Sequence, residues 1–470
     1  PQNKRLPSPC DVRFKWEKTK APSFIERLRD RAGDMKVLCD ELEARTADHP
    51  VTTDEIDNAV TDMSNIIKDC ASDFEHLYNS TNHKSKQPVW WNDECKTKKF
   101  AYYKAWESYQ FSKCDIDYYT MLEKKREFKN CTKYFKRQHM KDTLCNLELS
   151  NDSTLIWKLL GKKSSCVKQP AATKEEIFEH FSNLNGVEPQ ILGDHDDHVK
   201  SVVDNFQFDI SVEILDSDIT ESEVTDAIKS LKNGKAAGLD KLLNEFFIYG
   251  HDVMVAFICR LFNSVLSTGV YPSVWATGKL NLIYKGVSSS DLNNFRDITL
   301  LSNFGKLFDS VMNKRLQIWV EDLDILYNNQ AGFRKTYSTF DNIFVLQSLV
   351  YKSRVEQKKL FCAFIDFRKA FNSVFRYGLW YKLIQYNCSG KFLKVVKNMY
   401  DKLKCCVNTK EGLSEFFKSH VGVQQGAIMS PLLFAMYLND LTEVLKDEDG
   451  INVDGRYVKI LLYADDIVLF

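Results

Sequence analysis

The sequence lacks the features that mark several protein classes. No uninterrupted apolar run approaches the ~18 residues that a membrane-spanning helix needs, so the chain is not expected in a membrane. The chain opens on Pro1 without a secretory leader, and we expect it to be a piece of a longer protein. No internal repeat or low-complexity segment is present. The thirteen cysteines include no Cys-x-x-Cys pair and no zinc-ligand spacing, which predicts reduced, mostly buried thiols in an intracellular protein.

What is present is the composition of a folded protein with a large core. The 470 residues are 44% hydrophobic, 13% aromatic and 27% charged, which fits a globular protein and not a disordered one. At this length two or three domains are expected. Apolar runs of strand character gather beyond residue 240: Leu280–Tyr284, Leu360–Ile365, Lys459–Ala464 and Ile467–Phe470. Helices mixed with antiparallel strands predict the α+β class.

The net charge of zero conceals a strong local asymmetry. Lys and Arg together number 64, as do Asp and Glu, but residues 96–141 carry thirteen cations and five acids. Residues 194–226 carry eleven acids and one lysine. Aromatics are interleaved with the cations of the basic block: Phe100, Tyr102, Tyr103, Trp106, Tyr109, Phe111, Tyr118, Tyr119, Phe128, Tyr134 and Phe135. Because cations neutralise phosphates and rings stack on unpaired bases, this block is a candidate nucleic-acid surface. The alternative is a long amphipathic helix whose aromatics are core.

Helix starts and breaks are readable from local signals. Thr52, Thr173 and Thr220 are each followed three residues later by Glu, the capping-box pattern. The helix after Thr220 is expected to end at Gly234. The acidic residues 188–218 are expected to form a loop or connector, and Ser, Pro and Lys at 164–174 favour a break in the chain.

The sharpest chemical feature is a pair of acids near the end of the sequence. Asp465 and Asp466 lie between two apolar, β-prone runs, which predicts a hairpin with both acids at its tip. An ordinary tight turn is the alternative, but Asp-Asp fits poorly where both positions need positive φ. Two ionised carboxylates beside hydrophobic strands repel unless a cation lies between them, and hard oxygen ligands suit Mg²⁺.

A third acid has the same setting. Leu360–Ile365 is an apolar strand that ends at Asp366, for which a helix cap is the alternative role. If the two strands pair in one sheet, Asp366 and Asp465 converge and can share two metal ions. Two ions about 4 Å apart activate the attacking and leaving oxygens of an in-line phosphoryl transfer.

At this point the sequence resembles a known family. Three stretches are similar to the ordered palm motifs of reverse transcriptases: Phe364-Ile-Asp366 with Phe371, Gln425-Gly426 with Ser430-Pro431, and Tyr463-Ala-Asp465-Asp466. Others resemble the non-LTR, LINE-type retrotransposon branch: Asn233–Asp240, Gly269–Trp275, Tyr284–Gly286, Asn294–Ser302, Gly305–Phe308, Gln330–Arg334 and Ser430–Phe434. The resemblance covers about 220–470 closely and extends more weakly to Trp90–Asn92 and the basic block.

The resemblance implies a right-hand polymerase fold of α+β class. It divides the chain into a basic helical linker or extension (1–172), an N-terminal polymerase extension with fingers (173–355), and a palm (356–470). The palm, an antiparallel sheet with helices, is expected to be incomplete and truncated after the acidic hairpin. We also expect the endonuclease, the thumb and any zinc knuckle to be absent from this piece.

The resemblance also assigns roles to the acids. Asp366 and Asp465 would be catalytic metal ligands, and Asp466 a third acid at the metal site that contributes field more than direct ligation. Phe371 would lie under the incoming sugar and exclude a 2′-hydroxyl, so that dNTPs are selected by sterics.

Four further residues would contact the substrate. Gln425 and Gly426 match the motif that touches the nascent base pair, where glycine lets the backbone approach closely. Lys285 and Arg296 match basic positions of the fingers and would neutralise the triphosphate. A surface charge is the alternative for either cation.

Several positions depart from the family pattern. Asn372 stands where Asp is common, so weakened hydrogen bonding around the site is expected, without loss of a metal ligand. Gln424 stands where Arg is common, which removes one potential interaction with a backbone phosphate. Ala237 and Leu239 replace commoner prolines.

The function implied is RNA-directed DNA synthesis with two Mg²⁺ ions, for which Mn²⁺ could substitute. The expected partners are an RNA template, a DNA primer or target and dNTPs, with primer extension at a DNA or RNA 3′-hydroxyl. The parent element would work in the nucleus and cytoplasm. The alternatives are a catalytically silent RNA-binding relic and a group II intron maturase-like reverse transcriptase.

Overall fold

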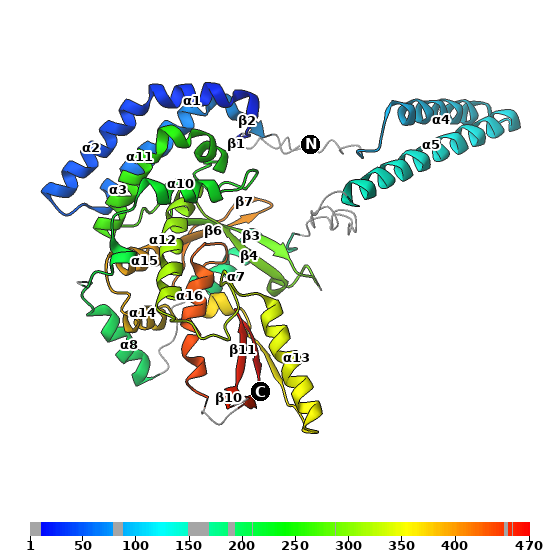
Figure 1. Ribbon diagram of the computed structural model, residues 1–470. Helices are drawn as coiled ribbons and strands as arrows, with labels where there is room; N and C mark the ends of the chain where they lie inside the picture. Colours follow the sequence, from blue (N-terminus) through cyan, green and yellow to red (C-terminus); the bar gives the residue numbers. More distant parts are fainter. Residues whose placement is uncertain are drawn as a thin grey trace. The chain divides into compact units, whose positions relative to one another are not determined.

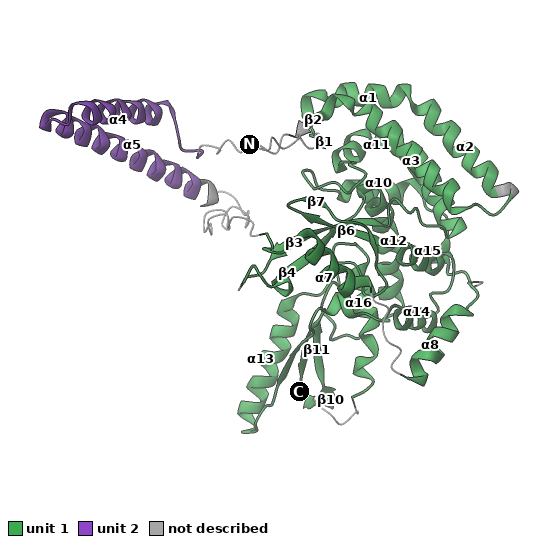
Figure 2. Ribbon diagram, turned by 180° about the vertical axis from the view of Figure 1, so that it is seen from behind, with its two compact units in different colours: residues 1–77, 168–470 green, residues 78–167 purple. Residues whose placement is uncertain are grey.

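A computed structural model of the protein describes residues 11–78, 88–148, 169–186, 193–208, 210–286, 288–445, 450–453 and 455–470. The chain forms two compact units, one of residues 1–77 with 168–470 and the other of residues 78–167 (Figure 2). The predicted extension, residues 1–172, is therefore divided between the two units. Of the predicted break at 164–174, residues 164–168 lie outside the described residues.

Helices build most of the larger unit (Figure 1). They are α1 (Ala21–Asp30), α2 (Ala32–Asp48), α3 (Thr53–Cys70), α7 (Lys174–Gly186), α8 (Asp194–Asp204), α9 (Glu213–Asp216), α10 (Glu221–Ser230), α11 (Asn244–Thr268), α12 (Asn303–Asp322), α13 (Thr339–Val355), α14 (Arg376–Gln385), α15 (Lys391–Asp401) and α16 (Ser430–Tyr437). No helix in the described ranges is long and apolar enough to cross a membrane.

Short antiparallel sheets lie among these helices. The strands are β1 (Asp11–Phe14), β2 (Glu75–Tyr78), β3 (Thr277–Tyr284), β4 (Phe295–Leu300), β5 (Ala363–Asp366), β6 (Lys404–Thr409), β7 (Gly412–Leu413), β8 (Phe417–Lys418), β9 (Ile451–Val453), β10 (Arg456–Val458), β11 (Ile460–Tyr463) and β12 (Asp466–Leu469). The largest sheet has the order β4-β3-β6-β7, with β8 also paired to β6, and only its β3–β6 pairing is parallel. A second sheet has the order β11-β12-β5. All four predicted strands are present, and the α+β class is confirmed.

The three predicted capping boxes are confirmed. Thr52, Thr173 and Thr220 each accept a hydrogen bond from the backbone N–H of the glutamate three residues on, and that glutamate accepts one from the threonine N–H. Each box satisfies N–H groups that the first turn of a helix leaves without a partner. The helices α3, α7 and α10 begin at the next residue.

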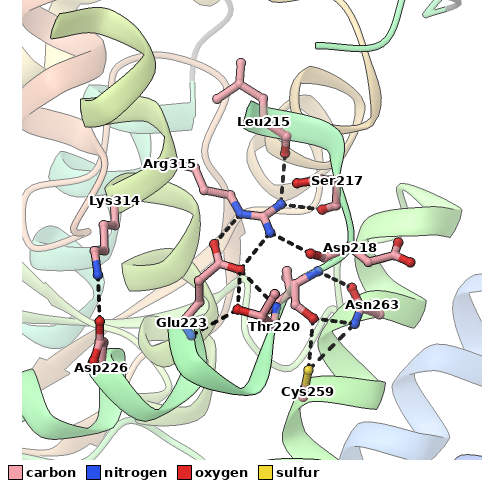
Figure 3. A network of polar contacts seen from close by, with 11 residues as sticks. Leu215, Ser217, Asp218, Thr220, Glu223, Asp226, Cys259, Asn263, Lys314 and Arg315 are labelled. Atoms are coloured by element: carbon pink, nitrogen blue, oxygen red, sulfur yellow. Dashed lines mark hydrogen bonds and ion pairs between the residues drawn. The ribbon is translucent and has the colours of Figure 1, made fainter. Parts of the chain in front are cut away.

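The capping box of α10 also anchors a guanidinium from α12. Arg315 donates to both carboxylate oxygens of Glu223, at 2.6 and 2.9 Å, and to the carbonyl oxygens of Ser217 and Asp218, at 2.5 and 3.0 Å (Figure 3). Its side chain is 5% exposed. One buried cation therefore joins α12, the start of α10 and the segment before it.

Two expectations, one about the acidic region and one about the end of the helix after Thr220, are wrong. Residues 194–204 form helix α8 and not a loop, because Val199 and Val203, one turn apart, are buried while three aspartates favour its first turn. The short helix α9 also lies in this region. Helix α10 ends at Ser230 and not at Gly234, since the residue after Ser230 already has an extended ψ of 142°.

The smaller unit is a helical hairpin of α4 (Asp93–Ser112) and α5 (Asp115–Glu148). The idea that its aromatics form a core is wrong for those with exposed rings: Phe100, Tyr103, Trp106, Phe111, Tyr118, Tyr119 and Tyr134. Cys95 and Met121 are the buried hydrophobic residues among its described part. Two helices in contact along one narrow seam leave most of each helix surface open to solvent.

The core of the larger unit is aromatic. The ring of Trp275 lies 5.1 Å from that of Phe304 and 5.8 Å from those of Phe262 and Phe308. Six buried cysteines also lie in this unit, and all eleven cysteines of the described ranges are free thiols, as expected. The hydroxyl of Tyr271, whose ring lies 5.7 Å from that of Trp275, donates to the carboxylate of Asp309 at 3.1 Å.

The buried carboxyl group of Asp309 should make stability depend on pH. Burial raises the pKa of Asp309 to about 7 against the opposing effects of Tyr271 and Lys306, whereas an exposed aspartate has a pKa of about 3.9. The folded state therefore binds the proton more tightly. This contribution to the free energy of unfolding is complete below about pH 4 and is lost as pH rises to about 7.

We expect Asp309→Asn to remove this pH dependence, because Asn still accepts from Tyr271 but does not ionise. The free energy of unfolding of the variant minus that of the original protein should be higher at about pH 8 than at about pH 5. Urea unfolding at the two pH values measures this difference. An equal effect of the substitution at both would contradict the assignment.

Candidate active site

Two of the predicted acids lie opposite each other in adjoining strands. In the antiparallel pairing of β5 with β12, Asp366 is the direct partner of Asp466, and Ile365 is the partner of Ile467. β12 pairs in turn with β11, where Tyr463 is the partner of Asp466. Directly opposed residues of an antiparallel pair have Cβ atoms about 4.5–5.5 Å apart. The sheet thus brings together acids from distant parts of the sequence.

The tip of the hairpin differs by one residue from the prediction. Its two-residue turn is Ala464 and Asp465, and Asp466 is the first residue of β12. Ala464 takes the positive φ, 59°, that a tight hairpin turn demands. As a result the residue directly across from Asp366 is Asp466, and Asp465 precedes it in the turn.

The two faces of the sheet have different surroundings. Ile460, Leu462 and Ile467 are buried together on one face, where they form their own apolar cluster. Because side chains alternate along a strand, Asp366 and Asp466 lie on the other face. The apolar cluster therefore fixes β11 and β12 from one side, and the two acids stand on the opposite side.

A pocket of about 430 Å³ is lined by residues of the β11-β12-β5 sheet and of α13. The sheet and this helix lie side by side in Figure 1. Asp366 and Asp466 border it, and Thr339 and Asn342 of α13 line its other side. The amide nitrogen of Asn342 donates to the carbonyl oxygen of Leu462 at 3.0 Å, which fixes α13 to β11. This volume is within the range of about 300–1,000 Å³ typical of small-molecule sites.

A second group of predicted residues is joined by hydrogen bonds. Nε of Arg296 donates to Oε1 of Gln425 at 3.1 Å, and Nε2 of Gln425 donates to Oδ1 of Asn372 at 2.8 Å. The backbone oxygen of Gln425 accepts from the N–H of Thr299 at 2.9 Å. The structure thus connects β4, the segment after β5 and the segment before α16.

Asn372 is well bonded, against the expectation of weakened hydrogen bonding. Its amide nitrogen donates to Oδ1 of Asn185 at 2.9 Å and to Oδ2 of Asp297 at 3.4 Å, while its oxygen accepts from Gln425. An aspartate there would lose both donated bonds and would meet the carboxylate of Asp297. The asparagine suits this neighbourhood because it is neutral and donates.

Gly426 and Phe371 are held against the same segments. Gly426 has a φ of 120°, and an added Cβ would lie 2.7 Å from the carbonyl oxygen of Thr299, so a side chain does not fit. The half-buried ring of Phe371 stacks on Phe434 of α16, with centroids 4.9 Å apart. The backbone oxygen of Phe371 accepts from the N–H of Val423 at 2.7 Å.

Lys285 shares a face with Arg296 but is outside the bonded group. It follows β3 directly, and its backbone N–H donates to Asn294 at 2.8 Å. Ile283 is the direct partner of Arg296, so alternation along the strand puts Lys285 on the face of Arg296. Both cationic residues are exposed, at the end of the hairpin where the chain passes from β3 to β4.

Comparison with known proteins identifies this region. Residues 285–470, which contain both the acidic sheet and the Arg296–Gln425–Asn372 chain, match the family described as "Reverse transcriptase (RNA-dependent DNA polymerase)". The chain contains a reverse transcriptase domain. Its relatives among curated proteins are polymerases of non-LTR mobile elements, so the domain is of the LINE type.

Three relatives illustrate the similarity. The RNA-directed DNA polymerase from the mobile element jockey of Drosophila melanogaster is 25% identical over 326 residues, 67% of this chain and 34% of that protein. The probable RNA-directed DNA polymerase from transposon BS of the same species is 25% identical over 271 residues, 57% of this chain and 30% of that protein. The Pol polyprotein of the R2DM element of Drosophila melanogaster is 26% identical over 264 residues, 56% of this chain and 24% of that protein. The chain spans about a third of the length of the first two relatives.

Among solved structures, telomerase from Candida albicans with a fragment of telomeric RNA aligns at a TM-score of 0.32 and 14% identity, over 58% of this chain and 54% of that one. A score this low adds nothing to the assignment of the reverse transcriptase domain.

The acidic face of the domain suits magnesium. Mg²⁺ is usually bound by one or two carboxylates together with substrate phosphates. Asp366 and the hairpin acids Asp465 and Asp466 supply such groups, and the like charges of Asp366 and Asp466, directly opposite each other, are destabilising without a cation. Within the described ranges no group of three His, Cys, Asp or Glu side chains is arranged to hold a metal ion. The residues therefore fit a site of two carboxylates that substrate phosphates complete.

The reverse transcriptase domain also depends on Arg376, which sequence analysis did not single out. Its guanidinium donates to the carbonyl oxygens of Gly422, Ser419 and Val421 at 2.8, 2.6 and 3.0 Å. Arg376 is 8% exposed, and burial lowers its pKa to about 10. It fixes the segment that leads to Gln425. An arginine after an apolar pair carries no signal of this role in the sequence.

We expect Asn372→Asp to destabilise the reverse transcriptase domain by about 1–3 kcal/mol, since it removes two donated hydrogen bonds and sets a charge beside buried Asp297. The free energy of unfolding, from thermal or urea melts, measures the loss.

The matched control is the double variant Asn372→Asp with Asp297→Asn, which exchanges donor and acceptor. It should recover most of the lost stability. If the double variant is destabilised by the sum of the two single effects, the two side chains are not coupled as described.

Proposed function

We propose that this chain carries the polymerase centre of a non-LTR retrotransposon protein. It would copy RNA into DNA by transferring nucleotidyl groups from dNTPs to a primer 3′-hydroxyl, with release of pyrophosphate. The single observation that supports it most is the pairing of Asp366 with Asp466 inside a domain of the reverse transcriptase family. With chromosomal DNA as the primer or target, the parent protein would act in the nucleus after translation in the cytoplasm.

In this proposal the acids hold the cations and the other residues hold the substrate. Two bound Mg²⁺ ions would supply charge stabilisation for the attacking and leaving oxygens. Asp366 and Asp465 would be the ligands, and Asp466 would add negative field from β12. Arg296 and Lys285, on one face of the β3–β4 hairpin, would bind the triphosphate oxygens.

Phe371 and Gln425 would select the nucleotide. Stacking on Phe434 restricts the ring of Phe371, so a 2′-hydroxyl could not be accommodated by a shift of the ring. Gln425 would meet the nascent base pair, with its carboxamide oriented by Arg296 and Asn372. Because Gly426 has no side chain, the base pair could approach its backbone closely.

Conservative substitutions can distinguish the roles of the three acids. They are made in the full-length natural polypeptide that contains this sequence. We expect Asp366→Asn and Asp465→Asn each to lower primer extension on a poly(rA) template by about 10³-fold or more, because a metal ligand contributes several kcal/mol to the transition state. Asp466→Asn should cost less, because its contribution is field and not direct ligation.

Glu443→Gln serves as the matched control, since Glu443 is an exposed acid outside the acidic sheet and should be silent. Full activity of Asp465→Asn would rule out the metal assignment. The maturase-like alternative predicts the same losses, but the relatives named above favour the mobile-element assignment.

A second, independent function is supported by the α4–α5 hairpin. Its exposed aromatic rings lie among cations, as on proteins that bind single-stranded nucleic acid by stacking and charge. Nζ of Lys99 lies 5.6 Å from the ring centre of Trp91 and 5.7 Å from that of Tyr103. We propose that the hairpin binds the RNA template, a role that would persist in a catalytically silent protein.

Two kinds of substitution in the hairpin should have different effects on single-stranded RNA binding. Replacing Phe100 and Tyr119 by Ala should weaken binding by about tenfold for each stacked base, and leave the dependence on salt unchanged. Replacing Lys133, Lys136 and Arg137 by Gln should lower the slope of log K against log salt by about 0.7 for each phosphate that the protein no longer neutralises.

Fluorescence anisotropy with a labelled RNA at several salt concentrations measures both effects. A salt response that none of these substitutions changes would exclude the hairpin as the binding surface, whatever the polymerase does. Loss of binding with intact primer extension would separate the two proposed functions.

A further inference from the structure

An irregular segment runs beside the acidic hairpin and is bonded to it along its backbone. The N–H of Leu462 donates to the oxygen of Asn329 at 3.0 Å, and the N–H of Ala331 donates to the oxygen of Leu462 at 2.9 Å. The amide nitrogen of Asn329 also donates to the oxygen of Ile460 at 3.0 Å. Residues 329–331 therefore extend the sheet beyond β11.

The side chain of Gln330 reaches the turn from this segment. Gln330 is 1% exposed, and its Oε1 accepts from the N–H of Gly332 at 2.9 Å and from the N–H of Ala464 at 3.1 Å. Two backbone donors at one end of the carboxamide fix which end is oxygen. One buried acceptor therefore joins the segment to the turn residue that precedes Asp465.

Close packing leaves this interaction little freedom. A Cβ added to Gly332 would lie 2.3 Å from the backbone nitrogen of Ala464. Arg334, two residues on, donates to both carboxylate oxygens of Glu321 in α12, at 2.9 and 2.6 Å. The segment that carries Gln330 is thus fixed to α12 at one end, and Gln330 bonds it to the turn at Ala464.

Ala464 needs this support because its backbone is strained. Its φ of 59° is in the left-handed region, which residues with a Cβ adopt at a cost. Such a conformation persists where the surroundings determine it, and Ala464 is 4% exposed with its N–H bonded to Gln330. The φ of Ala464 sets the direction in which the chain enters Asp465.

The other end of the carboxamide carries a penalty. Nε2 of Gln330 is buried without a hydrogen-bond partner, and a buried donor without a partner opposes folding. An apolar side chain of the same length would avoid that cost.

We propose that Gln330 is a positioning residue of the polymerase centre: its carboxamide oxygen holds the turn at Ala464 and so sets where Asp465 stands relative to Asp366. The metal-binding part of this inference rests on the proposed function, whereas the restraint on the turn does not. Gln330 acts through Ala464 and touches no reacting atom.

The test replaces Gln330 by Met, which keeps the length and burial of the side chain but removes the acceptor. Hydrogen exchange at the turn, measured by mass spectrometry on a peptide that spans Ala464, should accelerate by about tenfold in the variant, the effect of removing one hydrogen bond. Mn²⁺ affinity, followed by electron paramagnetic resonance, should weaken by about tenfold, as is typical when a residue that orients a metal ligand is replaced.

In the full-length natural polypeptide, Gln330→Met should lower kcat for primer extension and leave the affinity for primer and template unchanged. The Ala464→Gly background adds a check, since glycine takes positive φ without strain. There Gln330→Met should cost less stability than it does in the original protein.

Gln424→Met is the matched control. Gln424 is also a buried glutamine whose Nε2 lacks a partner, but it lies in the segment before Gln425 and not beside the turn. It should leave both turn exchange and Mn²⁺ affinity unchanged. Unchanged turn exchange in Gln330→Met overturns the proposal, and faster exchange with unchanged Mn²⁺ affinity overturns its positioning part. Retained Mn²⁺ affinity and activity in Asp465→Asn would instead refute the proposed function.

Discussion

The pairing of β5 with β12 is the constraint on which the site depends. It sets the carboxylates of Asp366 and Asp466 opposite each other, an arrangement that is unfavourable unless a cation neutralises it. The cost is carried by the buried face of the same sheet, where Ile460, Leu462 and Ile467 pack together. Apolar burial thus offsets the electrostatic repulsion of the two acids, and such a local cost is typical of a functional site.

Much of this could be predicted because the signals are local. Apolar runs bounded by acids predicted β5, β11 and β12, and Thr-to-Glu spacing predicted where α3, α7 and α10 begin. The hairpin tip was displaced by one residue, since a turn with φ of 59° at Ala464 is not expected from an alanine. Its support comes from Gln330, which is more than a hundred residues away in the sequence.

The rest depends on interactions between distant residues, which a single sequence does not reveal. Asn372 looked like a weakened copy of an aspartate, but Asp297 and Asn185 supply the partners that make an amide the better group. Arg376 carries no motif, although it fixes the segment before Gln425. Helix α8 was missed because its acids suggested a loop, while two buried valines one turn apart held it to the larger unit.

The most direct test of the account is a crystal structure of the full-length natural polypeptide with primer, RNA template, an incoming dNTP and Mn²⁺. We expect anomalous density for metal between the carboxylates of Asp366 and Asp465, beside the triphosphate. Density for metal elsewhere, or these carboxylates on different faces of the sheet, would contradict it.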